Sequence, residues 1–161
     1  MTNTYDLGDL VTVHGEITNP TSGAAVDPTA VVCIVTAPDG AETGYAYGLV
    51  SQGAWNAATN TPELSNAAGT AGHYYTVSAA GDVDFGNGET DFEAGDYAFF
   101  NGYEWKRLPG PSATAITKAG VGDYQLDVYA SQVGEWWYAF EGCGKPTGKC
   151  RGRDLFYVQA E

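Results

Sequence analysis

Residues 51–111 are rich in aromatic side chains, of which five are candidates for glycan binding: Trp55, Tyr74, Tyr75, Tyr103 and Trp105. Flat aromatic faces next to Asn and Asp side chains can stack on a sugar ring while amides and carboxylates bond its hydroxyls. The same rings could instead fill the core of so small a unit, which applies above all to Trp55 and Trp105. Tyr103 follows an Asn-Gly pair, so we expect it to be exposed.

An acidic loop in the same stretch carries oxygen donors of the kind that hold Ca²⁺. Its candidate ligands are Asp82, Asp84 and Asp91. The spacing fails the EF-hand pattern, because the sixth position would be Asn87 where that motif needs glycine. A solvated acidic turn explains the same residues, so we expect no resident metal and no cofactor.

Motifs for catalysis are missing from the sequence. His14 and His73 have no nearby serine or cysteine in a nucleophile elbow, and no Gly-rich phosphate-binding loop occurs. The many carboxylates show no pairing of the kind that a glycosidase needs. The sequence therefore predicts a protein that is not an enzyme.

The three cysteines do not suggest a disulfide framework. Cys143 and Cys150 flank a short loop around Pro146 and could form a hairpin disulfide after release into an oxidising medium. Without further ligands they make a poor zinc site. Cys33 lies in an apolar run, which is typical of a small buried side chain.

Charge is distributed unevenly along the chain. The net charge is −13, and residues 1–105 hold 14 of the 20 carboxylates but no lysine or arginine. Such a surface repels phosphate backbones, which argues against nucleic acid as a partner. Four basic residues nevertheless cluster near the C-terminus: Lys145, Lys149, Arg151 and Arg153. They could dock on an acidic patch of a neighbouring subunit, or compensate this protein's own acidic surface.

No membrane or secretion signal is recognisable. No apolar run approaches the roughly 20 residues that cross a bilayer. The first residues, MTNTYDLGDL, lack the basic and apolar regions of a secretory signal peptide. We therefore expect the protein to start in the cytoplasm of the cell that makes it.

Short β-strands must position these side chains. With 22 glycines and abundant Val, Thr and Tyr, the composition indicates an all-β protein. Alternating or continuous apolar runs predict strands at residues 10–18, 30–36, 42–50, 73–79, 96–100, 103–108, 121–130, 135–142 and 154–158. Asn101-Gly102 predicts a hairpin turn, since both residues tolerate positive φ.

Alternation within the outer runs predicts which side chains point inward. We expect the run at 30–36, apolar throughout, to be a central strand. The side chains expected to share a face toward the core are Val11, Val13, Ile17, Tyr124, Leu126, Val128, Trp136, Tyr138, Phe140, Phe156 and Val158.

The sequence predicts two domains, one nested in the other. Removing residues 51–111 leaves two flanks of 50 residues each, together the size of an immunoglobulin-like sandwich. We therefore interpret residues 1–50 and 112–161 as one discontinuous immunoglobulin-like β-sandwich, the anchor. Residues 51–111 would be a small outward-facing β module inserted in a loop. Three consecutive β units are the weaker alternative, because neither flank alone could bury much core.

The flanks resemble small immunoglobulin-like proteins encoded in tailed-bacteriophage structural gene clusters. The matching pieces are TYDLGDLVTV (4–13), DPTAV (27–31), APDG (37–40), GDYQLDVYA (122–130), GEWWYAFEG (134–142) and LFYV (155–158). The middle resembles a module of phage tail-fibre and other virion surface proteins. Its matching pieces are GAWNAATNTPEL (53–64), GHYYTVSAAG (72–81) and GDYAFFNGYEWKRL (95–108). The second resemblance is more specific, because it fixes Trp, Asn, Tyr, Gly and Asp in order.

The resemblance implies a non-enzymatic accessory structural protein of a phage particle, on the capsid, neck or tail. Its partners would be other virion proteins and further copies of itself, because virion symmetry repeats every attachment site. The middle module would project from the virion and contact host glycans. The alternatives are a receptor-binding tail-fibre component and a free carbohydrate-binding module. The loop between Cys143 and Cys150 departs from the family pattern, which usually has a plain loop there.

Overall fold

The computed structural model describes residues 3–144 and 154–161. Within these ranges the chain forms fourteen β-strands joined by turns and bends, without a helix. The predicted all-β class is confirmed. No helix long and apolar enough to cross a membrane occurs in the same ranges.

The strands are short and largely follow the predicted apolar runs. Their bounds are β1 (Asn3–Asp6), β2 (Leu10–Glu16), β3 (Ala30–Thr36), β4 (Glu42–Tyr47), β5 (Val50–Asn56), β6 (His73–Ala79), β7 (Gly81–Asp84), β8 (Glu89–Phe92), β9 (Tyr97–Phe100), β10 (Trp105–Leu108), β11 (Thr117–Gly120), β12 (Asp123–Tyr129), β13 (Gly134–Cys143) and β14 (Asp154–Gln159). The sequence pattern misses β1, β5, β7, β8 and β11. Except for β5, each of these has only four residues, too few for alternation to stand out.

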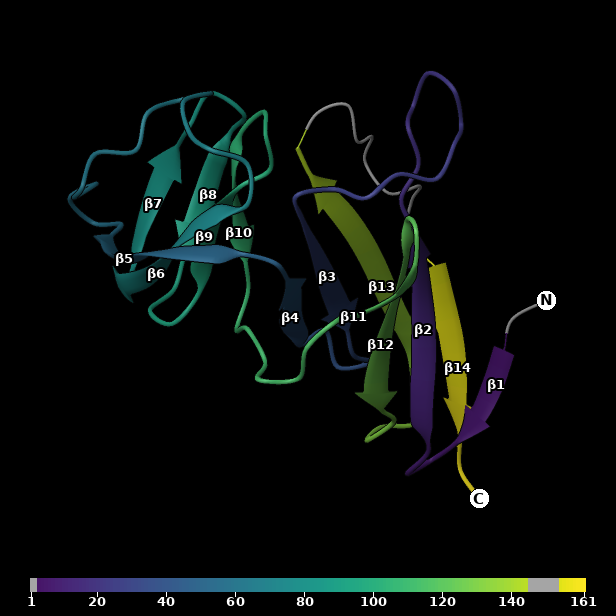
Figure 1. Ribbon diagram of the computed structural model, residues 1–161. Coiled ribbons are helices and arrows are strands. Elements are labelled where there is room, and N and C mark those ends of the chain that lie inside the picture. Colours follow the sequence, from purple (N-terminus) through teal and green to yellow (C-terminus); the bar gives the residue numbers. More distant parts are fainter. Residues whose placement is uncertain (1–2, 145–153) are drawn as a thin grey trace.

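Eight strands from the two ends of the chain form two sheets that face each other. One sheet has the order β1-β14-β13-β3-β4 and the other has the order β11-β12-β2. Strand β1 pairs in parallel with β14, so the first and last described segments lie side by side. Figure 1 shows these strands together, with β1 beside β14. We call this part the outer half.

The inward side chains of the outer half form one core. Its buried members are Val11, Val13, Ile17, Val31, Cys33, Val35, Ile116, Tyr124, Leu126, Val128, Ala130, Trp136, Phe140, Phe156 and Val158. Every predicted inward side chain is among them except Tyr138, which packs half-buried against the cluster. The ring of Phe140 lies on the backbone of Gly15, where an added Cβ would come within 2.3 Å of the ring. This close approach explains why glycine interrupts the alternation of β2.

Six strands from the middle of the chain form two further sheets, which we call the inner half. One sheet has the order β10-β9-β6-β5, and β7 and β8 form a hairpin. Their own buried core consists of Trp55, Ala57, Leu64, Val77, Phe85, Phe92, Ala98, Phe100 and Trp105. Figure 1 shows the inner half beside the outer half, next to β3 and β4.

The β9–β10 hairpin forms where Asn101-Gly102 predicts it. Phe100 pairs with Trp105, so four residues form the loop, where the Asn-Gly signal suggests two. Gly102 has φ of +101°, a conformation that glycine adopts at little cost. The Asn101 side chain closes the loop by accepting hydrogen bonds from the amides of Tyr103 and Glu104 at 2.8 and 2.9 Å.

Residues 42–50 are not the single strand that the sequence predicts. Strand β4 ends at Tyr47 and pairs with β3. Gly48 then has φ of +75°, and β5 begins at Val50 in the other half, parallel to β6. The left-handed glycine breaks the strand, so β4 ends three residues earlier than the apolar pattern suggests.

Strands β3 and β13 are covered by side chains on both faces. Val31, Cys33 and Val35 point into the outer core. Ala30 and Val32 belong to a third cluster with Phe99, Leu108 and Cys143, which joins the two halves. Burial on both faces explains why 30–36 is apolar throughout. The predicted central position is confirmed, since β3 lies between β13 and β4.

The chain returns to the outer half along the edge of β4. Gly44 donates its amide to the Pro109 carbonyl at 2.6 Å and accepts from the Ser112 amide at 2.8 Å. Further along, the Ile116 amide donates to Ala46. Residues 109–116 therefore cover a strand edge that would otherwise expose unpaired backbone groups.

Substituting Gly44 by alanine should destabilise the fold. An added Cβ would lie 2.5 Å from Leu108 Cγ and 2.7 Å from the Pro109 oxygen, so the returning chain must shift. Overpacking of this kind costs about 1–3 kcal/mol, which urea denaturation will measure. Gly120→Ala is the control, because its Cβ would meet only Asp123 Cβ at 3.9 Å. Equal stability of the two variants would contradict the tight joint at Gly44.

Asp27 fastens the turn between β11 and β12. Its carboxylate accepts from Lys118 Nζ at 2.7 Å, from the Gly122 amide at 3.0 Å and from the Tyr124 hydroxyl at 3.4 Å. The Lys118 ammonium and the Gly122 amide together hold the pKa of Asp27 below its usual 3.8. The folded protein therefore keeps this carboxylate ionised at a pH where the unfolded chain already binds a proton.

This lowered pKa predicts acid sensitivity. The stabilisation by Asp27 should be complete above its usual pKa of 3.8 and should disappear as the pH falls through the lower pKa of the folded state. Asp27→Asn should therefore be less stable than the parent protein near neutral pH, and the difference should shrink in acid. Urea unfolding over a series of pH values measures this, with Asp82→Asn as control. A stability difference that stays constant down to acid pH would exclude the proposed role.

Candidate functional site

The structure does not bring the five candidate aromatic side chains together. Trp55 and Trp105 are 0% and 3% exposed in the inner core, so neither presents an open ring face. Tyr74 packs against Tyr97, with ring centroids 4.1 Å apart and the ring planes tilted by 32°, and it also packs against the cluster between the halves. Tyr103 is 52% exposed at the hairpin loop, as the sequence predicts.

Tyr75 and Trp105 lie on the opposite face of the inner sheet from Tyr74. Strand alternation places Tyr74 toward the outer half and Tyr75 away from it. Tyr75 is half-buried, and its ring centroid lies 5.9 Å from that of Trp105. These two residues line a hollow of about 270 Å³ on this far face of the sheet. We call it the Tyr75 hollow.

One wall of the hollow is a loop that Asn60 organises. Asn60 Oδ1 accepts from the Trp55 indole at 3.0 Å and from the Leu64 amide at 2.9 Å, while Nδ2 donates to the Leu64 carbonyl. Asn60 has φ of +47°, a conformation that asparagine tolerates better than most residues. Trp55 therefore positions the loop and does not present its own ring to solvent.

Trp105 fixes the same loop at its other end. Its indole donates to the Ala68 carbonyl at 3.0 Å. Gly69 lies against the rings of Phe100 and Trp105, where a Cβ would come within 2.7 Å of Phe100. The buried indoles of Trp55 and Trp105 thus fix the loop wall of the hollow through hydrogen bonds to Asn60 and Ala68.

Polar side chains surround the aromatic floor of the hollow. The lining residues are Gln52, Glu63, Leu64, Ser65, Ala68, Gly69, Thr70, His73, Tyr75 and Trp105. Sequence reasoning found Tyr75 and Trp105 but missed the polar members. No motif marks them, because the loop fold that gathers Glu63, Ser65 and Thr70 depends on contacts of Asn60 with Trp55 and of Ala68 with the distant Trp105.

Two further hollows lie elsewhere in the described structure. One of about 200 Å³ is lined by Tyr74, Tyr97 and the returning segment 111–115, at the joint between the halves. The other, of about 300 Å³, opens beside β2 and β14 and is lined by Tyr5, His14, Asp154 and neighbours. His14 and His73 thus line different hollows, and His14 lies 3.5 Å from Asp123 on the surface.

The acidic candidates lie on the β7–β8 hairpin. Asp82 and Asp91 are paired residues of the two strands. Asp84 caps the turn, with its carboxylate accepting from the amides of Gly86 and Gly88 at 2.7 and 3.2 Å. Within residues 3–144 and 154–161, no three His, Cys, Asp or Glu side chains are grouped to hold a metal ion.

Several predicted residues lie outside the described residues. These are the basic cluster Lys145, Lys149, Arg151 and Arg153, together with Cys150 of the predicted disulfide. Cys143 is fully buried in the cluster between the halves. Burial, with the Glu141 carboxylate nearby, raises the pKa of its thiol to about 12, which disfavours the reactive thiolate.

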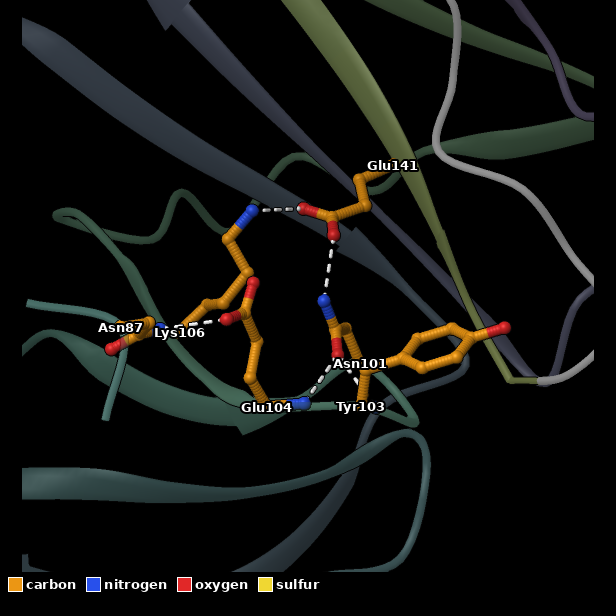
Figure 2. A network of polar contacts seen from close by, with 6 residues as sticks. All are labelled: Asn87, Asn101, Tyr103, Glu104, Lys106 and Glu141. Carbon is orange, nitrogen blue, oxygen red and sulfur yellow. Dashed lines mark hydrogen bonds and ion pairs between the residues drawn. The ribbon is translucent and has the colours of Figure 1, made fainter. Parts of the chain in front are cut away.

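A polar network fastens the inner half to β13 (Figure 2). Glu141 on β13 accepts from Asn101 Nδ2 at 2.9 Å through one oxygen and from Lys106 Nζ at 2.9 Å through the other. Asn101 is only 3% exposed, and its backbone carbonyl accepts a hydrogen bond from the Gly144 amide. We call Glu141, Asn101 and Lys106 the Glu141 clasp. At the edge of the network, Glu104 accepts from Asn87.

Removing the Glu141 carboxylate should loosen the joint between the halves. Glu141→Ala leaves the largely buried Asn101 amide and the Lys106 ammonium without their acceptor, at a cost of about 2 kcal/mol in unfolding free energy. Chemical denaturation measures the loss. Glu104→Ala is the matched control: it removes a carboxylate of the same network that holds only Asn87, and should change stability by less than about 0.5 kcal/mol. Equal losses in both variants would contradict the clasp.

Comparisons with known proteins give no relative for this chain: no family model, no curated protein and no solved structure matches it.

Proposed function

We propose that the chain is a non-enzymatic accessory structural protein of a tailed-bacteriophage particle. An immunoglobulin-like sandwich, residues 1–50 and 112–161, attaches to other virion proteins. The inserted module, residues 51–111, projects from the particle and contacts host glycans. The observation that carries the two-domain arrangement in this proposal is that the two chain ends build one pair of sheets around a core separate from that of the middle.

The strand order of the outer half supports the immunoglobulin-like part of the proposal. In immunoglobulin sandwiches, strands B, E and D share one sheet and strands C, F and G share the other. The order β2-β12-β11 corresponds to B-E-D, and β3-β13-β14 corresponds to C-F-G. Strand β4 would extend the second sheet beyond C. On this assignment the module is inserted between β4 and β11.

The chain path supports insertion into a loop. The chain leaves the outer half after Tyr47 and returns along the edge of the same strand, through the Gly44 contacts with Pro109 and Ser112. Departure and return are therefore close together, as an inserted domain requires. The virion assignment itself comes from the sequence resemblance of the flanks and of the module.

A second function is favoured by one specific observation, the Tyr75 hollow. Its aromatic floor and polar rim also suit a free carbohydrate-binding module or a receptor-binding fibre component. Both differ from the first proposal in an observable way. A free module is not part of the particle, and a fibre component is confined to the tips of the tail.

The location of the protein in infected cells tests the proposal. Antibodies raised against the chain should detect it in particles of the encoding phage purified by density gradient, and immunogold should label intact particles at regularly repeated positions. A lysate of cells that express the chain alone, without particles, is the control for co-sedimentation. Recovery only in the soluble fraction would overturn the virion proposal and favour the free module.

A further inference from the structure

We infer that the Tyr75 hollow binds one uncharged sugar ring. This inference rests on the proposed glycan contact of the inner half and names its site and ligand class. The hollow lies on the face of the inner sheet opposite the outer half, since Tyr74, Phe99 and Leu108 occupy the face toward the joint. A surface ligand can therefore approach it without meeting the sandwich.

The hollow is formed before any ligand arrives. Its loop wall is held by the hydrogen bonds of Trp55 to Asn60 and of Trp105 to Ala68. Leu64, 7% exposed, anchors the same loop in the inner core. A wall fixed by buried groups loses little conformational entropy on binding, which favours affinity for a small ligand.

The lining combines the two surfaces that a sugar needs. The half-buried Tyr75 ring offers apolar area for the C–H face of a pyranose, and the buried Trp105 packs against it. Gln52, Glu63 and His73 on the rim offer donors and acceptors for its hydroxyls. The volume of about 270 Å³ lies just below the roughly 300–1,000 Å³ of ordinary ligand pockets. One ring fits better than an extended oligosaccharide.

The charge of the residues that line the hollow favours neutral sugars over anionic ones. The lining holds no lysine or arginine, and its one carboxylate is Glu63. The two basic residues that follow Trp105 already bind carboxylates: Lys106 holds Glu141 and Arg107 holds Asp96 at 2.6 Å. An anionic sugar would thus enter an acidic surface without a counter-charge. The hollow should accept neutral sugars and reject sialic and uronic acids.

Monosaccharide titration of the full chain tests the inference. In ¹H–¹⁵N spectra, glucose and N-acetylglucosamine should shift amide signals of residues 63–75, whereas N-acetylneuraminic acid and glucuronic acid should not. Tyr75→Ala should raise the dissociation constant for the neutral sugars about tenfold, which corresponds to a loss of about 1.4 kcal/mol in binding free energy. Tyr75→Phe should retain binding, because it keeps the ring.

Controls separate loss of the site from loss of the fold. Glu63→Ala and Gln52→Ala alter exposed rim residues and should weaken binding with unchanged melting temperature. Tyr129→Ala removes an aromatic ring that is 62% exposed on the outer half and should leave binding intact. Absence of shifts with neutral sugars, preference for the acids, or binding lost only in Tyr103→Ala would each overturn the inference. The virion proposal is judged separately by particle association, which does not involve the hollow.

Discussion

The whole structure depends on two strands, β3 and β13, that are covered on both faces. One face of each strand packs in the outer core through Val31, Cys33, Trp136 and Phe140. The opposite face meets the inner half through side chains such as Val32 and Cys143. These two strands also pair with each other over seven residues. Neither half can therefore move relative to the other without exposing apolar surface of this central pair.

The hydrogen bonds of the Glu141 clasp fix the orientation of the inner half on β13. Apolar contacts between layers are non-directional and tolerate sliding, whereas the two oxygens of Glu141 fix Asn101 and Lys106 at definite positions. Because Asn101 also closes the β9–β10 loop, the residue that shapes this hairpin also sets how the hairpin sits on the outer half. The Asn101 side chain therefore contributes both to the β9–β10 turn and to the contact between the two halves.

Much of the outer half could be predicted, because its strands alternate cleanly. Tyr124, Leu126 and Val128 on β12 are buried as the period of two requires. The break at Gly48 could not be predicted, since a glycine between Tyr47 and Leu49 looks like part of a strand until its φ is known.

The candidate site was predicted less well than the fold. Tyr74 and Tyr75 were grouped by composition, although alternation places them on opposite faces. The contribution of Asn60 could not be inferred, because it depends on contacts with Trp55 and Leu64 inside a folded loop.

The sugar site proposed in the Tyr75 hollow would make few contacts, so one copy would bind one sugar ring weakly, with a dissociation constant of the order of 1 mM or a binding free energy of about −4 kcal/mol. Adhesion through such a site would require many copies that bind at once, which the symmetry of a virion would supply if the chain is part of one, as proposed. Simultaneous binding is possible only if every hollow faces the same way relative to its anchor. A flexible tether would spread these orientations and lower the effective concentration of the second site. The buried pair β3–β13 and the Glu141 clasp restrict that freedom, so the proposed adhesion would depend on the joint between the halves as well as on the Tyr75 hollow.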